Sequence, residues 1–346
     1  MHLYLLFVVV AIANSHRIPA QYFSDTGTVS IRVGAQQETF NLDLTTLLDK
    51  TIVFSKECLT TQCLNFRDIL HVYDDSNDQH NNTSTFLPGL NCENLNSVPI
   101  AVGSLKFTAD FSTFHPNGDL LDTSDLEEKS FKHFEGYLPL RFGRDHLFDT
   151  AFEHVPLEPR TVTFVPAISG SLESGMYIGD YPPNLCEPFG EMVQTRKAHG
   201  TDSLLLMNHS RVTFGANTYD WNVFIAAGPK FVFNQNPATK FFGRLVAEKR
   251  ISEKDFQALP PNITVPLPGI GHVVILRESF YAKDGGFYYP LYIIGGWAGD
   301  FGLNQATIKD KCFRLDKTSG EWTWGFSHRT IKPEIGITRA FNWSVQ

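Results

Sequence analysis

Apolar and polar residues alternate with a period of two along most of the chain. Successive side chains of a β-strand point to opposite faces, so this pattern predicts strands with one buried face. Three such runs carry their apolar positions at Val29, Ile31 and Val33, at Phe107, Ala109 and Phe111, and at Trp322, Trp324 and Phe326. The last run follows a Lys-Thr-Ser-Gly turn at 317–320. We therefore expect a mostly β fold.

Helical periodicity is confined to short segments. The segment Ser252–Leu259 predicts one helix, with Ser252 as its N-cap and Pro260 ending it. The polar tract from Asp74 to Ser84 predicts an exposed loop, and Gly269-Ile-Gly271 predicts a hairpin turn. The expected architecture is antiparallel β with a few short helices.

The N-terminus has the pattern of a secretory signal peptide. An apolar run from Leu3 to Ala13 is too short to span a bilayer, and small residues up to Ser15 suit cleavage before His16. Residues 1–15 are therefore expected to be a signal peptide, and the mature protein to be secreted to the extracellular space. Asn-x-Ser/Thr sequons, the acceptors of N-glycosylation, occur at Asn81, Asn82, Asn208, Asn262 and Asn342.

Composition narrows the classes of partner. Hydrophobic residues make up 42% of the 346 residues and charged residues 19%, as in a globular protein, and the net charge is −8. An acidic chain is a poor match for nucleic acid or an anionic membrane, and no later stretch reaches transmembrane length. The 12 histidines form no H-E-x-x-H motif, and no C-x-x-C motif is present. We expect no metal and no cofactor.

The five cysteines allow a limited pairing scheme. Cys58 and Cys63 are close enough in sequence for a local bridge in an oxidising compartment. Cys92, Cys186 and Cys312 then leave one thiol over, and their pairing stays open at this point.

Several segments resemble the pepsin-like aspartic peptidase family. Gly27–Gly34 followed by Gln36–Phe40 resembles its first hairpin, G-T-I-x-I-G-x-P-x-Q-x-F. The family continues with F-x-V-x-x-D-T-G-S-S-x-L-W-V-x-S-x-x-C. In the same register Phe40, Val53, Ser55 and Cys58 match this motif without a gap. This register carries Cys58 and Cys63 onto the family's small disulfide loop, so the resemblance also implies their bridge.

Later segments resemble the family in the same order. Phe134–Leu140 resembles F-D-G-I-L-G-L, Ser174–Gly179 resembles S-G-x-L-x-x-G, and Leu259–Ile263 resembles L-P-x-I. Gly299-Asp300 resembles the L-G-D turn, and Phe313–Phe326 the closing V-F-D…V-G-F hairpin. The resemblance implies a bilobal fold with a central cleft, with an N-terminal lobe at 16–190 and a C-terminal lobe at 191–346.

The chemistry of this family needs two carboxylates that share one proton, one from a D-T-G loop of each lobe. The aligned positions here read Thr45-Thr46-Leu47 and Ala226-Ala227-Gly228. Neither Thr45 nor Ala226 can ionise and activate water, so the resemblance implies a homologue without peptidase activity. The residues expected to line its cleft are Thr45, Thr46, Val102, Gly103, Ala226 and Gly228.

Three further differences from the family's pattern also indicate a homologue without peptidase activity. The flap turn, where active relatives carry Tyr before Gly, is Val102-Gly103-Ser104. Pro139 replaces a family glycine, and the stretch from His16 to Gly27 is too short for the usual inhibitory pro-segment.

Other carboxylates near these positions could substitute for the missing pair. Asp25-Thr26-Gly27 is a literal D-T-G, but no apolar strand precedes it, which favours an exposed turn. Asp43 and Asp49 flank the Thr45 position and are the candidates for a displaced base.

The sequence is compatible with three candidate functions. The first is a secreted, non-catalytic protein that binds a polypeptide or another partner. The second is a weak or altered aspartic endopeptidase, and the third is a structural or storage glycoprotein. The sequence predicts neither the ligand nor the oligomeric state.

Overall fold

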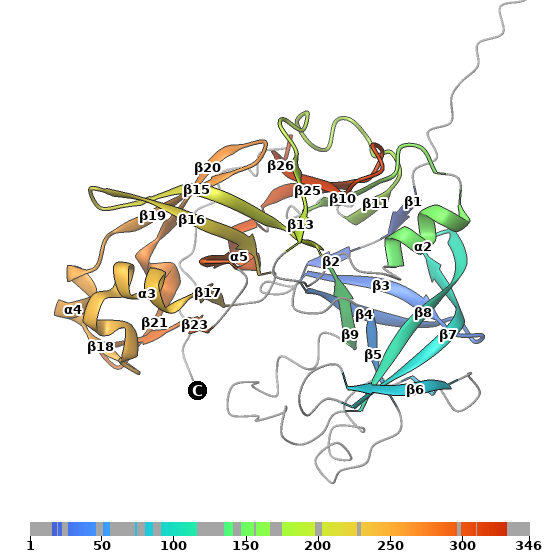
Figure 1. The fold of residues 1–346 in the computed structure, drawn as a ribbon, viewed down its shortest axis with the longest axis horizontal. Coiled ribbons are helices and arrows are strands. Elements are labelled where there is room, and N and C mark those ends of the chain that lie inside the picture. The colour runs from blue at the N-terminus through green and yellow to red at the C-terminus, as the bar shows by residue number, and fades with distance from the viewer. Residues whose placement is uncertain are drawn as a thin grey trace, which may run out of the picture.

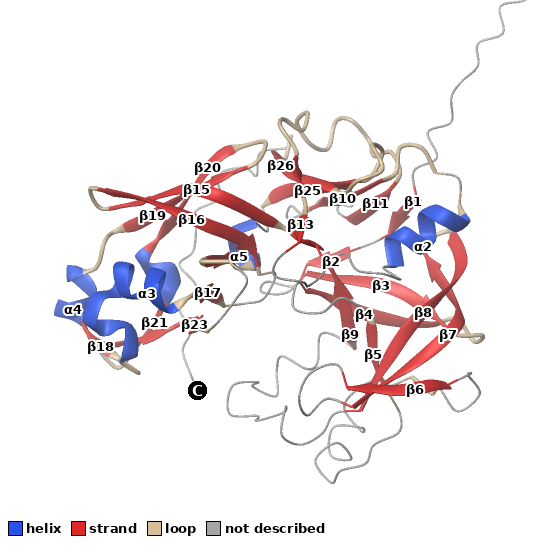
Figure 2. Ribbon diagram, in the orientation of Figure 1, coloured by secondary structure: helices blue, strands red, loops and turns tan. Residues whose placement is uncertain are grey.

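The computed structural model describes the backbone of most of the chain, namely residues 16–18, 20–22, 27–45, 51–55, 73–74, 80–85, 91–115, 135–140, 147–155, 157–166, 175–197, 203–226, 230–295, 299–308 and 310–330. The described residues are mostly β-strand with a few short helices (Figures 1 and 2). The mostly β prediction is confirmed, and the sheets are barrel-like.

The first half of the chain supplies a sheet of eight described strands. Their order is β2 (Ala20–Tyr22), β3 (Gly27–Val33), β4 (Glu38–Thr45), β9 (Gly136–Pro139), β5 (Ile52–Phe54), β8 (Leu105–His115), β7 (Asn91–Val102) and β6 (His80–Thr85). An additional pairing of Arg32 in β3 with Ala101 in β7 curls this sheet into a barrel.

The second half supplies a sheet of seven described strands. Their order is β20 (Gly271–Leu276), β19 (Asn262–Leu267), β15 (Leu206–Phe214), β16 (Asn217–Ile225), β24 (Phe301–Leu303), β17 (Phe231–Phe233) and β23 (Tyr292–Ile294). At one end lie the helices α3 (Gln235–Phe242), η1 (Gly243–Ala247), α4 (Glu253–Ala258) and η2 (Arg277–Phe280), with the small sheet of β18 (Ile251–Ser252), β22 (Phe287–Pro290) and β21 (Tyr281–Asp284) (Figure 1).

A third sheet takes strands from both halves. Its order is β1 (His16–Ile18), β11 (Gly175–Ile178), β10 (Thr161–Val165), β25 (Lys311–Asp316), β26 (Thr323–His328) and β12 (Val193–Gln194). The remaining elements are α2 (Leu147–His154), α5 (Gln305–Ile308) and the pair β13 (Arg196–Lys197) and β14 (Ser203–Leu204). Because β10 pairs with β25, the expected boundary at 190/191 separates the two barrel-like sheets, while the third sheet spans it.

A disulfide and an ion pair join β25 and the turn after it to earlier parts of the chain. Cys186 is bonded to Cys312 of β25, 126 residues away. Lys317, just after β25, pairs with Asp149 of α2, and the indole of Trp322 donates to the same carboxylate at 3.2 Å. The pairing of these two cysteines, which the sequence left open, is a long-range contact.

The two barrel-like sheets repeat one arrangement of strands. In the first, the β3–β4 hairpin is followed by a parallel β4–β9 pair, an antiparallel β9–β5 pair and a parallel β5–β8 pair. In the second, the β15–β16 hairpin is followed by parallel β16–β24, antiparallel β24–β17 and parallel β17–β23. The matching strands also occur in the same order along the chain, so the fold contains an internal repeat.

Local patterns predicted several elements correctly. Val29, Ile31 and Val33 are all buried in β3, and the glycine turn at 269–271 joins β19 to β20. Helix α4 begins after Ser252, whose hydroxyl accepts from the Asp255 amide, as an N-cap should. The exposed-loop prediction for Asp74–Ser84 is wrong in part, because 80–85 form β6 and pair with β7.

Candidate functional site

The internal repeat brings Thr45 and Ala226 to equivalent positions. In the first sheet Leu44 pairs with Leu138, and Thr45 follows at the end of β4. In the second sheet Ile225 pairs with Leu303, and Ala226 follows directly after β16. Each residue therefore stands at the carboxyl end of a parallel strand pair. This equivalence comes from strand register alone.

The surroundings of Ala226 are apolar. Its side chain is 3% exposed and packs with Leu206, Phe224 and Val232. Its amide donates to the carbonyl of Leu303 at 2.8 Å, which extends the β16–β24 pairing by one residue. A methyl group in such a cluster offers no proton and no charge to a ligand.

The residues across from these two positions do not ionise either. Thr45 pairs with Pro139 in β9, and the matching residue after β24 is Asn304. The Asn304 carboxamide accepts from the amide and hydroxyl of Thr307 at 3.1 and 2.7 Å, so it caps α5. By this register Leu303-Asn304 is equivalent to Leu138-Pro139.

Carboxylates do occupy equivalent positions, but at the opposite ends of the same strands. Glu135 accepts from the Asn41 amide at 2.6 Å, and its own amide donates back to the Asn41 carbonyl at 2.7 Å. Asp300 and Asn222 make the same two bonds at 2.8 and 2.6 Å. Sequence reasoning missed this pair, although an acidic residue directly before a short buried strand recurs in both halves.

These two carboxylates lie at the start of their strand pairs, whereas Thr45 and Ala226 lie at the other end. Asp300 precedes Leu303 by three residues, which is about 10 Å along a strand, and Glu135 precedes Leu138 by the same step. Each carboxylate satisfies a backbone amide at the start of its strand pair. We interpret both as structural anchors of the repeat.

The flap candidates lie on the β7–β8 hairpin. Val102 is 1% exposed and belongs to the barrel core, and Gly103 forms the turn with a φ of 63°. The Arg32 guanidinium donates to the Gly103 carbonyl at 2.9 Å, which ties the hairpin tip to β3. The Val102 side chain therefore contributes to packing. Thr46 and Gly228, with Asp25, Thr26 and Asp49, lie outside the described residues.

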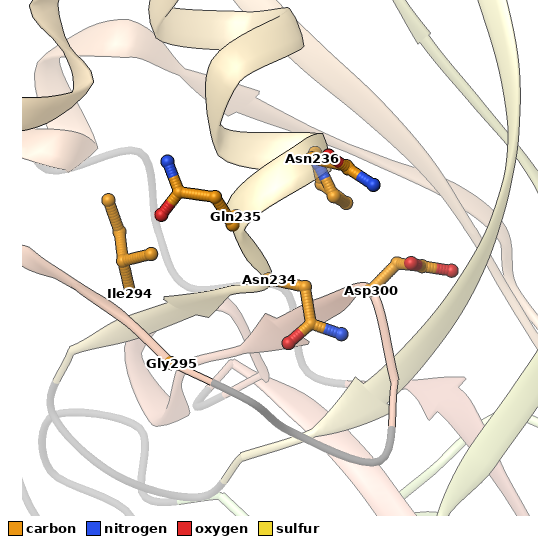
Figure 3. A pocket seen from close by; sticks show the side chains of 7 residues that line it. Asn234, Gln235, Asn236, Ile294, Gly295 and Asp300 are labelled. Carbon is orange, nitrogen blue, oxygen red and sulfur yellow. The ribbon is translucent and has the colours of Figure 1, made fainter.

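An open hollow of about 510 Å³ lies beside α3 (Figure 3). Its lining combines the start of α3, the end of β23 and Asp300 before β24. The side chain of Asn234 donates to the Gly299 carbonyl at 2.7 Å, so this rim is held by internal hydrogen bonds. Since Asp300 marks the start of β24, the hollow is at the far end of the sheet from Ala226.

The predicted covalent sites are distributed over several elements. Asn81 and Asn82 lie on β6, Asn208 on β15, Asn262 at the start of β19 and Cys92 on β7. Cys58, Cys63 and Asn342 lie outside the described residues. The Cys58–Cys63 bridge and the occupancy of the sequons therefore stay predictions.

Searches for other kinds of site gave no candidates in the described ranges. Among the described residues, no group of three or more His, Cys, Asp or Glu side chains could hold a metal ion. No helix within the described part of the chain is long and apolar enough to cross a bilayer. No protein-family model matches the sequence, and a comparison with curated proteins finds no match either.

Proposed function

We propose that this chain is a secreted, non-catalytic glycoprotein of bilobal, pepsin-like architecture that binds an extended polypeptide between its lobes. The internal repeat supports this architecture, because that family has two lobes that each supply one D-T-G loop. The Cys186–Cys312 disulfide supports an oxidising compartment, in keeping with the signal-peptide pattern at 1–15.

One observation carries the non-catalytic part of the proposal. Thr45 and Ala226 end equivalent strands of the repeat, where a paired active site would need two carboxylates. A hydroxyl and a methyl group cannot share a proton or activate water. The lobes can still offer strand edges to an extended chain, which is the usual way such polypeptides bind.

The activity test uses the purified full chain with denatured globin between about pH 2 and 7, the range that brackets the titration of ordinary carboxylates. We expect no peptide release above background, with an active aspartic peptidase as the positive control. Inhibitors that mimic the tetrahedral transition state through a central hydroxyl should bind poorly, since no shared proton meets that group. Cleavage that Asp43→Asn or Asp49→Asn abolishes would establish the weak endopeptidase instead.

The binding test uses alkylated globin peptides as the probe. Thr45→Trp should weaken peptide binding by about ten-fold or more, because an indole ring is much bulkier than the threonine side chain that the proposed cleft would present. Thr218→Trp is the matched control on the exposed part of β16, and it should leave binding unchanged. Equal binding by both variants would place the ligand elsewhere, and no binding by any form would favour a storage or structural glycoprotein.

A further inference from the structure

The outer face of the second barrel-like sheet is polar along three neighbouring strands. In β19, Ile263, Val265 and Leu267 are buried, while Asn262 and Thr264 are turned toward solvent. The same side of β15 and β16 is polar as well, at Arg211, Thr213, Thr218 and Asp220. This alternation is the usual pattern of an antiparallel sheet with one wet face.

The alternation breaks on β20. Val274 and Leu276 point outward and are 49% and 54% exposed. Among the described strands β20 is the last one on its side of the sheet, so these apolar side chains lie on an edge. Exposed apolar residues on an edge strand favour pairing with another chain unless something covers them.

The strand register places a sequon beside this apolar pair. Asn262 is directly opposite Leu276, and Thr264, the third residue of Asn262-Ile-Thr264, is directly opposite Val274. Opposed residues of an antiparallel pair lie on the same face with Cβ atoms about 4.5–5.5 Å apart. The group attached to Asn262 thus emerges next to the two exposed apolar side chains.

We propose that Asn262 carries an N-linked glycan whose first sugars cover Val274 and Leu276. The Asn262 amide nitrogen bonds to the anomeric carbon of an oligosaccharide carried on a lipid diphosphate; the lipid diphosphate leaves and one amide proton is lost. A pyranose ring presents one face of C–H groups, which can pack on aliphatic side chains, and its hydroxyls stay in water. The inference rests on the proposed secretion, which gives the chain access to this donor.

Asn208 provides an internal contrast. It lies where β15 is irregular between Met207 and Ser210, and the Ser210 hydroxyl is buried and donates to the Met207 carbonyl at 3.3 Å. Its neighbour His209 contacts Asp220 at 3.0 Å, both exposed. A glycan at Asn208 would therefore stand over a polar surface and cover no apolar pair.

The experiment expresses the full chain in a secreting eukaryotic host and maps glycosylated asparagines by mass spectrometry after enzymatic deglycosylation in oxygen-18 water. We expect Asn262 to be occupied. Asn262→Gln should self-associate. At concentrations where the parent protein stays monomeric, the molar mass of this variant measured by light scattering should be at least that of a dimer. Asn208→Gln is the control and should remain monomeric. Adding Val274→Thr and Leu276→Thr to Asn262→Gln should return the monomer.

Each other outcome overturns the inference in a distinguishable way. A secreted chain that is glycosylated at other sequons but not at Asn262 overturns this inference alone. A monomeric Asn262→Gln protein shows that the glycan does not shield the edge. A chain that carries no glycan at any of the five sequons overturns the proposed secretion together with the inference.

Discussion

Glu135 and Asp300 hold the same place in the two repeats of this protein. Each carboxylate accepts the amide of an asparagine, Asn41 or Asn222, that stands one residue before the parallel strand pair. The amide of each acidic residue returns a hydrogen bond to the same asparagine. Their carbonyls also play matching roles, since they accept from the amides of Phe54 and Asn234. The repeat is therefore preserved in its hydrogen bonds as well as in its strand order.

Removing either carboxylate should destabilise the fold. Glu135→Ala and Asp300→Ala each leave a partly buried amide without its charged acceptor, which should lower the free energy of unfolding by about 1–3 kcal/mol. Urea unfolding measures the effect. Glu158→Ala is the control, because Glu158 is exposed and its ion pair with Arg160 at 3.6 Å lies on the surface. If only one of the two variants were destabilised, the structural equivalence of Glu135 and Asp300 would be contradicted.

The long-range disulfide should contribute strongly to stability. Replacing both Cys186 and Cys312 by Ala should lower the free energy of unfolding by roughly 2–5 kcal/mol, because the bond closes a long loop in the unfolded chain. Alkylation of the unfolded, unreduced chain should label Cys92 alone if Cys58 and Cys63 are bridged as proposed. Labelling of Cys58 or Cys63 would refute that bridge, and labelling of Cys186 or Cys312 would refute the bond in the structure.

Glu253 should make stability depend on acid pH. Hydrogen bonds from Gln257, Tyr288 and Lys283 lower the pKa of the Glu253 carboxyl to about 2 from its ordinary 4.5. Since the folded pKa is the lower one, the stabilisation is present above the unfolded pKa of 4.5 and is lost as pH falls towards 2. Glu253→Gln should flatten the decline of the urea midpoint between about pH 5 and 2. Glu248→Gln, an exposed residue without these partners, should retain the parent's slope.

A carboxyl group introduced at Ala226 should be poorly tolerated. The cluster of Leu206, Phe224 and Val232 disfavours the charged form, so Ala226→Asp should have a folded pKa above the unfolded value of about 3.9. For a raised acid pKa, stability falls as pH rises through the unfolded value. Ala226→Asp should therefore be less stable than the control Ala226→Asn at pH 7 and approach it near pH 3, by urea unfolding. Equal stability at both pH values would mean that the site still accommodates a charge.

The sequence by itself determined the local features of this fold. Period-2 alternation located β3, β8 and β26, because a strand's two faces are set by neighbouring residues. Ser252 fixed the start of α4, since an N-cap bond closes over three residues.

The tertiary structure decided which distant segments meet. Nothing in the sequence near His80–Thr85 signals a strand, and β6 forms because β7 offers it a partner. The Cys186–Cys312 bond and the pairing of β10 with β25 both join residues more than a hundred positions apart. Such contacts depend on the closing of long loops and on burial shared between sheets, which no local pattern encodes.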